Sequence, residues 1–152
     1  MAIRIIAIGK KHESWLVEGI ERYQKRLRRP YVIEWVFLHH SILSGDMARL
    51  EESQRIVSSL NGNAFVILLD EMGKNIDSPA LAKLLSSSLG DSCEVVIIIG
   101  GAFGVDETVH KRANFVWSLS ALVFPHQLVR LILVEQIYRA QEISLGNPYH
   151  HQ

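Results

Sequence analysis

The sequence predicts one α/β domain over residues 1–152, with a mostly parallel sheet covered by helices on both faces. Two observations lead to this prediction. Strand-like apolar segments alternate along the chain with segments of helical periodicity, and that order requires crossover connections between parallel strands. Residues 65–69 and 95–99 are also continuous apolar runs, the kind that a parallel sheet buries on both faces.

The first half of the chain predicts three strands and two helices. Residues 3–8 are apolar and β-branched, as a strand requires. Residues 15–27 predict a helix, because apolar side chains recur there at helical spacing with basic side chains between them. A second strand follows at residues 31–38. Apolar side chains return to helical intervals over residues 47–60, and the third strand is the run at residues 65–69.

The second half continues the alternation. Ser78 is expected to cap a helix that runs to about residue 89, since a proline follows at the first helical position. Residues 95–99 form the fourth strand, and Asp106 is expected to cap a short helix. Residues 115–119 form the fifth strand. Pro125 then begins a long helix that runs to about residue 145.

The charge of the chain is balanced but unevenly distributed. Sixteen Lys and Arg side chains face sixteen Asp and Glu side chains, which argues against a protein that coats bare nucleic acid. Residues 1–30 nevertheless carry eight basic and three acidic side chains, a net charge of +5. This segment is either a solvated helix face or a positive docking patch.

The composition also restricts compartment and chemistry. Cys93 is the only cysteine, so an internal disulfide and a multi-cysteine zinc site are excluded, and a reducing cytosol is indicated. The first residues lack the pattern of an export signal. The longest uncharged apolar run, residues 95–105, is about half of the ~20 residues that a membrane span needs. We therefore expect a cytoplasmic protein with no membrane span and no metal.

Ligands of parallel sheets bind beyond the carboxyl ends of the strands, which directs attention to three segments. After the third strand, Asp70 and Glu71 offer oxygens for ribose hydroxyls, or they belong to a turn in which Gly73 has a positive φ. After the fourth strand, residues 100–104 read Gly-Gly-Ala-Phe-Gly. Their spacing fits neither a Walker A loop nor a dinucleotide fingerprint, but it allows a nucleotide-like ligand to approach the backbone.

The third segment is an apolar loop, residues 118–126, between the fifth strand and the last helix. Apolar loops are unusual unless they line a pocket or lie under another segment. Backbone groups flanked by Leu122, Val123 and Phe124 would suit an adenine ring, and a simple buried connection is the alternative.

The last helix and the C-terminal tail carry further candidates. Residues 128–134 are apolar almost all round except for Arg130, so the helix lies in a deep core or contacts a partner, and the size of the domain favours a dimer. Arg130 must then be paired or reach a ligand. Glu135 and Arg139 can pair one turn apart. The tail, with Tyr149, His150 and His151, binds a metal, stacks on an unpaired base or is simply a frayed terminus, and the sequence leaves these alternatives open.

Taken together, these motifs resemble a known family. The relevant residues are the Gly-Gly-Ala-Phe-Gly run, Phe-Pro-His-Gln-Leu-Val-Arg at residues 124–130, Glu-Gln-Ile-Tyr-Arg-Ala at 135–140 and Pro-Tyr-His-His at 148–151. The chain is similar over its whole length to the ribosomal RNA large subunit methyltransferase H family, which are SPOUT-class enzymes that methylate N3 of a pseudouridine in 23S ribosomal RNA. The resemblance implies a five- to six-stranded SPOUT sheet with a C-terminal trefoil knot, and a homodimer packed through the C-terminal helix. It also implies S-adenosyl-L-methionine as cofactor and assembled ribosomes in the cytoplasm as substrate.

The resemblance also implies the site residues. Cofactor contacts fall on the three strand ends selected above, at Leu69, Gly101, Ser120, Ala121, Leu122, Val123, Phe124 and Pro125. The candidate catalytic residues are His126, Arg130, Tyr149 and His150. We expect His126 at the mouth of the cofactor site near the target base, and the tail of the partner subunit on the RNA. The alternatives are a SPOUT methyltransferase that acts on another RNA and a ribosome-associated factor without enzymatic activity.

Overall fold

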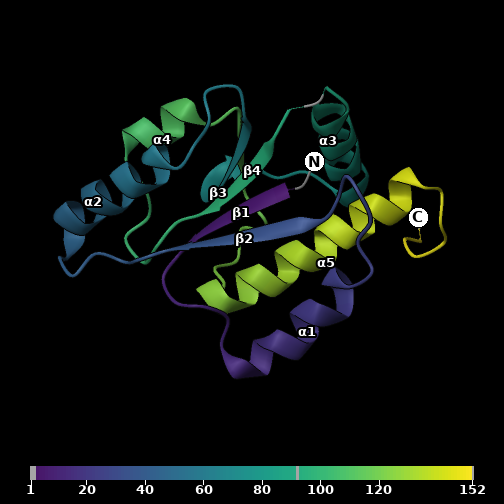
Figure 1. Ribbon diagram of the computed structural model, residues 1–152, viewed down its shortest axis with the longest axis horizontal. Coiled ribbons are helices and arrows are strands. Elements are labelled where there is room, and N and C mark those ends of the chain that lie inside the picture. Colours follow the sequence, from purple (N-terminus) through teal and green to yellow (C-terminus); the bar gives the residue numbers. More distant parts are fainter. Residues whose placement is uncertain (1–2, 92, 152) are drawn as a thin grey trace.

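A computed structural model describes residues 3–91 and 93–151 of the chain and contains one sheet of five parallel strands (Figure 1). The strand order is β2-β1-β4-β3-β5. The strands are β1 (Ile3–Ile8), β2 (Ile33–Leu38), β3 (Phe65–Lys74), β4 (Val95–Ile99) and β5 (Phe115–Trp117). The helices are α1 (Ser14–Gln24), α2 (Gly45–Ser58), α3 (Ser78–Gly90), α4 (Glu107–Arg112) and α5 (His126–Ser144).

The helices cover both faces of the sheet, as the alternating sequence predicts. Ile3, Ile5 and Ala7 of β1 pack in one cluster with side chains of α1, α3 and α5. Ile6 and Ile8 of the same strand pack in a second cluster with side chains of α2 and α4. Every residue of β4 is buried, because this strand lies between β1 and β3 and is covered from both sides. The predicted fold class is therefore confirmed.

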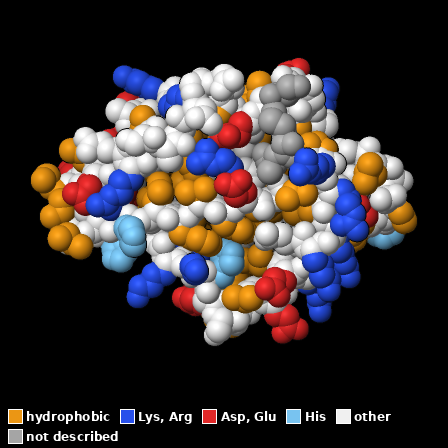
Figure 2. Space-filling view, viewed as in Figure 1, with side chains coloured by type: hydrophobic (Ala, Val, Ile, Leu, Met, Phe, Trp, Pro, Cys, Tyr) orange, Lys and Arg blue, Asp and Glu red, His pale blue; other side chains and the backbone are white. Residues whose placement is uncertain are grey.

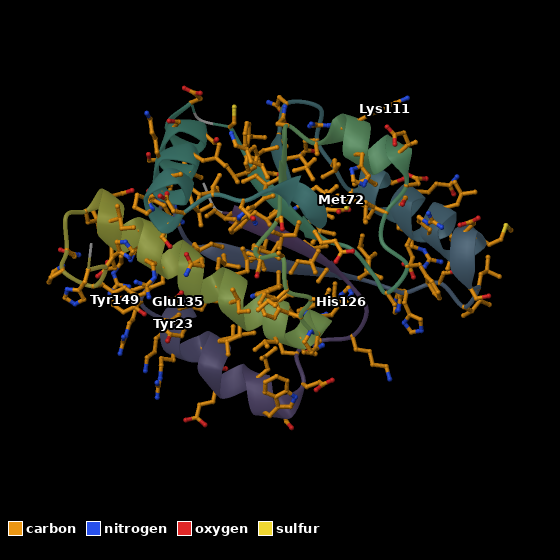
Figure 3. The ribbon with its side chains drawn as sticks, turned by 180° about the vertical axis from the view of Figure 1, so that it is seen from behind. Tyr23, Met72, Lys111, His126, Glu135 and Tyr149 are labelled. Carbon is orange, nitrogen blue, oxygen red and sulfur yellow. The ribbon has the colours of Figure 1, made fainter. Side chains whose placement is uncertain are left out.

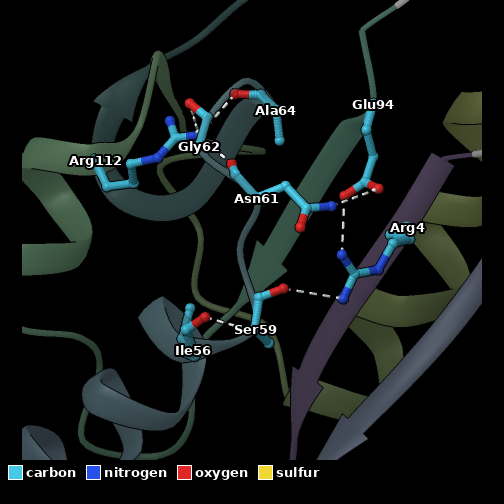
Figure 4. Close-up of polar contacts among 8 residues, drawn as sticks. All are labelled: Arg4, Ile56, Ser59, Asn61, Gly62, Ala64, Glu94 and Arg112. Atoms are coloured by element: carbon cyan, nitrogen blue, oxygen red, sulfur yellow. Dashed lines mark hydrogen bonds and ion pairs between the residues drawn. The ribbon is translucent and has the colours of Figure 1, made fainter.

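Polar contacts close the end of the sheet where the strands begin (Figure 4). Arg4 of β1 forms an ion pair of 2.8 Å with Glu94, the residue before β4. Arg112, the last residue of α4, donates to the backbone oxygens of Asn61 and Ala64 at 3.0 and 2.8 Å. These contacts fix the loops at this end, so the opposite edge of the sheet is the one that is open to a ligand.

Several boundaries differ from those predicted. β2 begins at Ile33 and not at residue 31, β5 ends at Trp117 and not at residue 119, and α1 ends at Gln24 and not at residue 27.

Two further differences have a clear structural reason. The third strand does not end at Leu69 but continues, after an irregularity, to Lys74, which pairs with Trp117 of β5. Gly73 is therefore a strand residue, and the alternative of a turn in which Gly73 has a positive φ is wrong, since the positive-φ glycines of the described chain are Gly9, Gly45, Gly104 and Gly146. A Cβ at Gly73 would lie 2.6 Å from the backbone oxygen of Val116, so close packing against β5 explains this glycine.

The second difference concerns the start of α3. The predicted cap, Ser78, is the first residue of the helix, and the N-cap is Asp77, whose Oδ1 accepts from the backbone N–H of Ala80 at 2.9 Å. The hydroxyl of Ser78 instead donates to Oε1 of Gln136 at 2.7 Å. The cap of α4 is as predicted, because Asp106 accepts from the backbone N–H of Thr108 at 3.0 Å.

Helix α5 lies between α1 and α3 on its face of the sheet. The approach to α1 is close, since a Cβ at Gly19 would lie 3.2 Å from Cδ1 of Leu131. Part of the apolar surface of α5 is thus covered within the chain, whereas Leu128, Leu131 and Ile132 are half-buried. The single-domain organisation, the homodimer and the trefoil knot stay predictions. Among the described residues, no helix is both long and apolar enough to cross a membrane.

Candidate functional site

A cavity of about 470 Å³ lies at the carboxyl ends of β3, β4 and β5. This volume is within the usual range for small-molecule sites. The three segments selected from the sequence meet here: the end of β3 with Asp70 and Glu71, the glycine loop 100–104, and the loop between β5 and α5.

Most of the residues predicted to contact the cofactor lie in the wall of this cavity. The six that line it are Leu69, Gly101, Ser120, Leu122, Val123 and Phe124. Ala121 and Pro125 are not among the lining residues. Cofactor contact by these eight residues stays a prediction.

The loop between β5 and α5 is held in shape by polar contacts. Nδ2 of Asn75 donates to the backbone oxygen of Ser118 at 2.8 Å, which ties the loop to the segment after β3. The hydroxyl of Ser120 accepts from the backbone N–H of Leu122 at 3.0 Å. Leu122 and Val123 are nevertheless 70% and 80% exposed. A fixed loop that presents apolar side chains to a cavity suits a flat apolar ligand such as an adenine ring.

The glycine loop forms a tight turn on the opposite wall. The backbone N–H of Gly104 donates to the oxygen of Gly101 at 3.0 Å, and Gly104 has a φ of +73°. A Cβ at Gly101 would lie 2.5 Å from Oε1 of Glu52, so a side chain at this position would require Glu52 to move. Gly100, Gly101 and Gly104 line the cavity and have no side chains, so the loop presents its backbone there.

Asp70 supplies oriented carboxylate oxygens within β3, directly after Leu69, where the register with β5 becomes irregular. Its Oδ1 accepts from the backbone N–H of Met72 at 2.8 Å, and its Oδ2 lies 3.4 Å from Nε2 of His110. Asp70 and the neighbouring Glu71 both line the cavity. Carboxylates at this place can accept hydrogen bonds from the hydroxyls of a ribose.

His126 is the first residue of α5 and also lines the cavity. Burial is the main cause that lowers the pKa of His126 below its ordinary value of 6.5, and the positive charge of Arg130 lowers it further. Glu52 acts in the opposite direction and raises it. The imidazole is consequently neutral at pH 7 and able to accept a proton.

Arg130 lies one turn further along α5 but does not line the cavity. It is 2% exposed, and its Nη1 donates to the backbone oxygen of Lys10 at 2.9 Å. The guanidinium carbon lies 5.3 Å from the ring centre of Phe37. Burial lowers the pKa of Arg130. Burial of His12, together with the positive charge of Arg130, lowers the pKa of His12 to about 4. Arg130 thus fixes the segment between β1 and α1 to the start of α5.

The C-terminal tail folds back on the other end of α5, where Figure 3 shows Tyr149 far from His126. The hydroxyl of Tyr149 donates to Oε1 of Glu135 at 3.2 Å, and the guanidinium of Arg139 lies 4.8 Å from its ring centre. Arg139 also contacts Nδ1 of His150 at 3.0 Å and forms the predicted pair with Glu135, at 2.6 Å. Burial and Glu135 raise the pKa of Tyr149 to about 12.

One chain therefore does not bring the four candidate catalytic residues together. His126 faces the cavity, Arg130 faces the segment after β1, and Tyr149 and His150 belong to a separate cluster at the end of α5. Within residues 3–91 and 93–151, no three side chains of the types that ligate metals are close enough to hold an ion.

Sequence reasoning missed one residue at the site, Glu52 of α2. It is 3% exposed, and its Oε1 would lie 2.5 Å from a Cβ at Gly101 of the glycine loop. A signal for it exists, since Glu52 is spaced four residues from both Ala48 and Ile56, which are buried on the same side of the helix. An acidic residue in phase with the apolar face of a helix is unusual and points to a specific role.

A parallel α/β sheet with a cavity beyond the carboxyl ends of its strands is the usual ligand-binding arrangement of open α/β proteins. The family profile described as "Predicted SPOUT methyltransferase" matches residues 1–150, and the chain belongs to this family of methyltransferases. The resemblance inferred from the motifs is thereby confirmed.

Several proteins named "Ribosomal RNA large subunit methyltransferase H" are similar to the chain over nearly its whole length. The protein of Desulfitobacterium hafniense is 40% identical over 158 residues, with 99% of both chains covered. The proteins of Coxiella burnetii and Geobacter metallireducens are 37% and 39% identical, again with 99% of each chain covered.

Proposed function

We propose that this methyltransferase uses S-adenosyl-L-methionine to methylate N3 of a pseudouridine in 23S ribosomal RNA, acting on assembled ribosomes in the cytoplasm. The observation that carries the proposal is the cavity of about 470 Å³ at the three strand ends. The names of the similar proteins support a large-subunit ribosomal RNA as substrate.

The residues of the cavity fit this cofactor. The exposed side chains of Leu122 and Val123 offer an apolar surface for the adenine, and the carboxylate of Asp70 offers acceptors for the ribose hydroxyls. Gly100, Gly101 and Gly104 line the cavity without side chains, so a ligand can approach the backbone of this loop. When bound, the cofactor supplies a methyl group already activated on a sulfonium ion, which leaves alignment and proton removal to the protein.

The proton of N3 must leave when the nitrogen is methylated. His126 lines the cavity and its pKa is lowered, so its neutral ring can take this proton. The N3 proton lies between two carbonyl groups and is weakly acidic, so even a modest base assists its loss. We assign His126 as the base that accepts it.

A homodimer packed through α5 completes the proposed site. Within one chain, Tyr149 of the tail reaches back along α5 to Glu135, which is nine residues, or about 14 Å, from His126 along the helix. Antiparallel packing of two α5 helices would carry the tail of each subunit toward the cavity of the other. In that arrangement Tyr149 and His150 contact the RNA in the partner's site, and half-buried Leu128 and Ile132 contribute to the interface.

The test is to map methylated nucleosides by mass spectrometry in ribosomes from a strain that lacks the enzyme, before and after incubation with the protein and cofactor. We expect one new N3-methylated pseudouridine in 23S ribosomal RNA of whole ribosomes. Free ribosomal RNA and isolated subunits serve as comparison substrates. Methylation of transfer RNA or of a ribose 2′-hydroxyl instead would assign another RNA, and no methylation of any RNA would contradict the proposal.

A further inference from the structure

We propose that Glu52 is a positioning residue that selects the charge of the cofactor: its buried carboxylate favours the cationic methyl donor over the neutral thioether that remains after transfer. The inference rests on the proposed function, since it takes S-adenosylmethionine as the ligand of the cavity. It adds a role for a residue of α2, an element that otherwise contributes nothing to the site.

The carboxylate of Glu52 is buried and only half satisfied. Its side chain is 3% exposed, and Oε2 accepts from the backbone N–H of Ser41 at 2.8 Å. Oε1 is also buried and has no hydrogen-bond partner in the part of the chain that the structure describes. No ion pair to Glu52 is formed among those residues either. A buried carboxylate without a cation is costly to the fold, which suggests that it is retained for another purpose.

The unsatisfied oxygen lies against the glycine loop that lines the cavity. Oε1 would lie 2.5 Å from a Cβ at Gly101, and Cγ2 of Ile8 would lie 3.1 Å from the same Cβ. Gly101 itself lines the cavity, whereas Glu52 does not. The carboxylate would therefore act on a ligand as a charge behind the glycine loop and not by direct contact.

The field of Glu52 also reaches the mouth of the cavity, since its charge raises the pKa of His126. The cavity contains no basic side chain among its lining residues, which are apolar, acidic or small apart from His126. A positive ligand therefore meets an environment of uncompensated negative charge, and a neutral ligand gains nothing from it.

Methyl transfer changes the charge of the cofactor. The bond between the methyl carbon and sulfur breaks and leaves its electron pair on sulfur, while the same carbon forms a bond to N3 and the N3 proton passes to the base. S-adenosylmethionine thereby loses the positive charge of its sulfonium, and S-adenosylhomocysteine is left. A buried negative charge beside the cavity would hold the first compound and release the second.

Calorimetric titration of both compounds into wild type and Glu52→Gln tests the inference. The substitution removes the charge and keeps an acceptor for Ser41. We expect the dissociation constant for S-adenosylmethionine to rise about tenfold and that for S-adenosylhomocysteine to change by no more than about twofold. Glu51→Gln is the matched control, since Glu51 lies on the same helix but is paired with Arg55 at the surface. In this variant the affinity ratio, which is the dissociation constant for S-adenosylhomocysteine divided by that for S-adenosylmethionine, should stay unchanged.

A purely structural role makes different predictions. If Glu52 had only a structural role, Glu52→Gln would weaken the binding of both compounds equally, or the variant would be unfolded. Either result overturns the inference. We expect instead a melting temperature within about 3 °C of wild type, because a costly buried charge is removed. Glu52→Asp keeps the charge and should keep the affinity ratio within about threefold; a ratio lost in this variant also overturns the inference. A wild-type chain that binds neither compound would overturn the proposed function itself, and the inference with it.

Discussion

His126 and Arg130 lie one helical turn apart in the same motif, yet their surroundings differ. His126 lines the cavity, whereas Arg130 is held by the backbone oxygen of Lys10 and the ring of Phe37. The family resemblance made both residues catalytic candidates, although the sequence also left open that Arg130 is paired within the fold. Their separation depends on the segment after β1 and on β2, which supply the partners of Arg130 from residues more than 90 positions away.

His126→Ala should lower the rate of methylation by about 10²- to 10⁴-fold, the usual contribution of a general base. The affinity for the cofactor, measured by calorimetry, should change little. The dependence of the methylation rate on pH tests the assignment of His126 as the base. Because the pKa of His126 is lowered below 6.5, the wild-type rate should stay high at neutral pH and fall only as the pH drops below that value.

The acidic fall in rate should be absent from the residual activity of His126→Ala. If His126→Ala kept the wild-type rate, or kept the wild-type fall in rate at acidic pH (the acidic limb of the pH profile), another group would have to accept the proton. His150→Ala is a comparison from the tail cluster, and it should affect RNA binding without removing the acidic limb.

At the scale of elements, strand and helix positions followed from periodicity, but their ends depended on partners distant in sequence. β1 and β4 have the predicted bounds, since both are almost entirely apolar and buried; Arg4 is the one charged residue of β1, and β4 has none. β3 is five residues longer than expected because Lys74 pairs with β5. α3 is capped one residue earlier because Ser78 is engaged by Gln136 of α5. Local patterns contain no information about such partners.

Gly73→Ala tests the reason for the extension of β3. The new methyl group would lie 2.6 Å from the backbone oxygen of Val116, so β3 and β5 would have to separate. We expect a loss of more than about 2 kcal/mol in the free energy of unfolding. Gly90→Ala is the control, because a Cβ there meets no atom within 4 Å, and it should leave stability within about 1 kcal/mol. Chemical denaturation of both variants measures the difference; equal stabilities would mean that the close approach imposes no constraint.

For the whole molecule, the balanced charge hides a local asymmetry. Five basic side chains near the end of α1 are all exposed and form the basic patch: Arg22, Lys25, Arg26, Arg28 and Arg29. Figure 2 shows Lys and Arg side chains gathered on this side of the molecule. The sequence left open whether the patch is only a solvated helix face. Exposure of all five side chains together is what a phosphate-binding surface needs.

The double variant Lys25→Gln/Arg26→Gln should weaken binding to ribosomes. The slope of the logarithm of the binding constant against the logarithm of the salt concentration should become shallower by about 1.5, since two phosphate contacts are lost. Cofactor affinity should not change. Lys83→Gln/Lys111→Gln is the control, because both lysines are exposed but lie on α3 and α4. An equal loss in both double variants would indicate an effect of net charge and not of the basic patch.

The candidate site was predictable to a different extent in each of its parts. The three strand ends were found because the carboxyl edge of a parallel sheet is a general ligand position, and the structure brings them together in one cavity. Glu52 was missed because it lies in a segment without a motif, and its role depends on a contact with Gly101, 49 residues away in the chain. Packing across the sheet, which no local pattern encodes, decides such contacts.

The position of the tail along α5 has one more consequence. If the tail of each subunit serves the cavity of the other, two inactive proteins should restore each other when their subunits exchange. A chain with His126→Ala still has its tail, and a chain cut after Gly146 still has its His126. Random exchange makes half of the dimers mixed, and each mixed dimer contains one site with both parts intact. About a quarter of the wild-type activity should therefore return. If no activity returned although the subunits had been shown to exchange, the residues of each active site would come from a single chain.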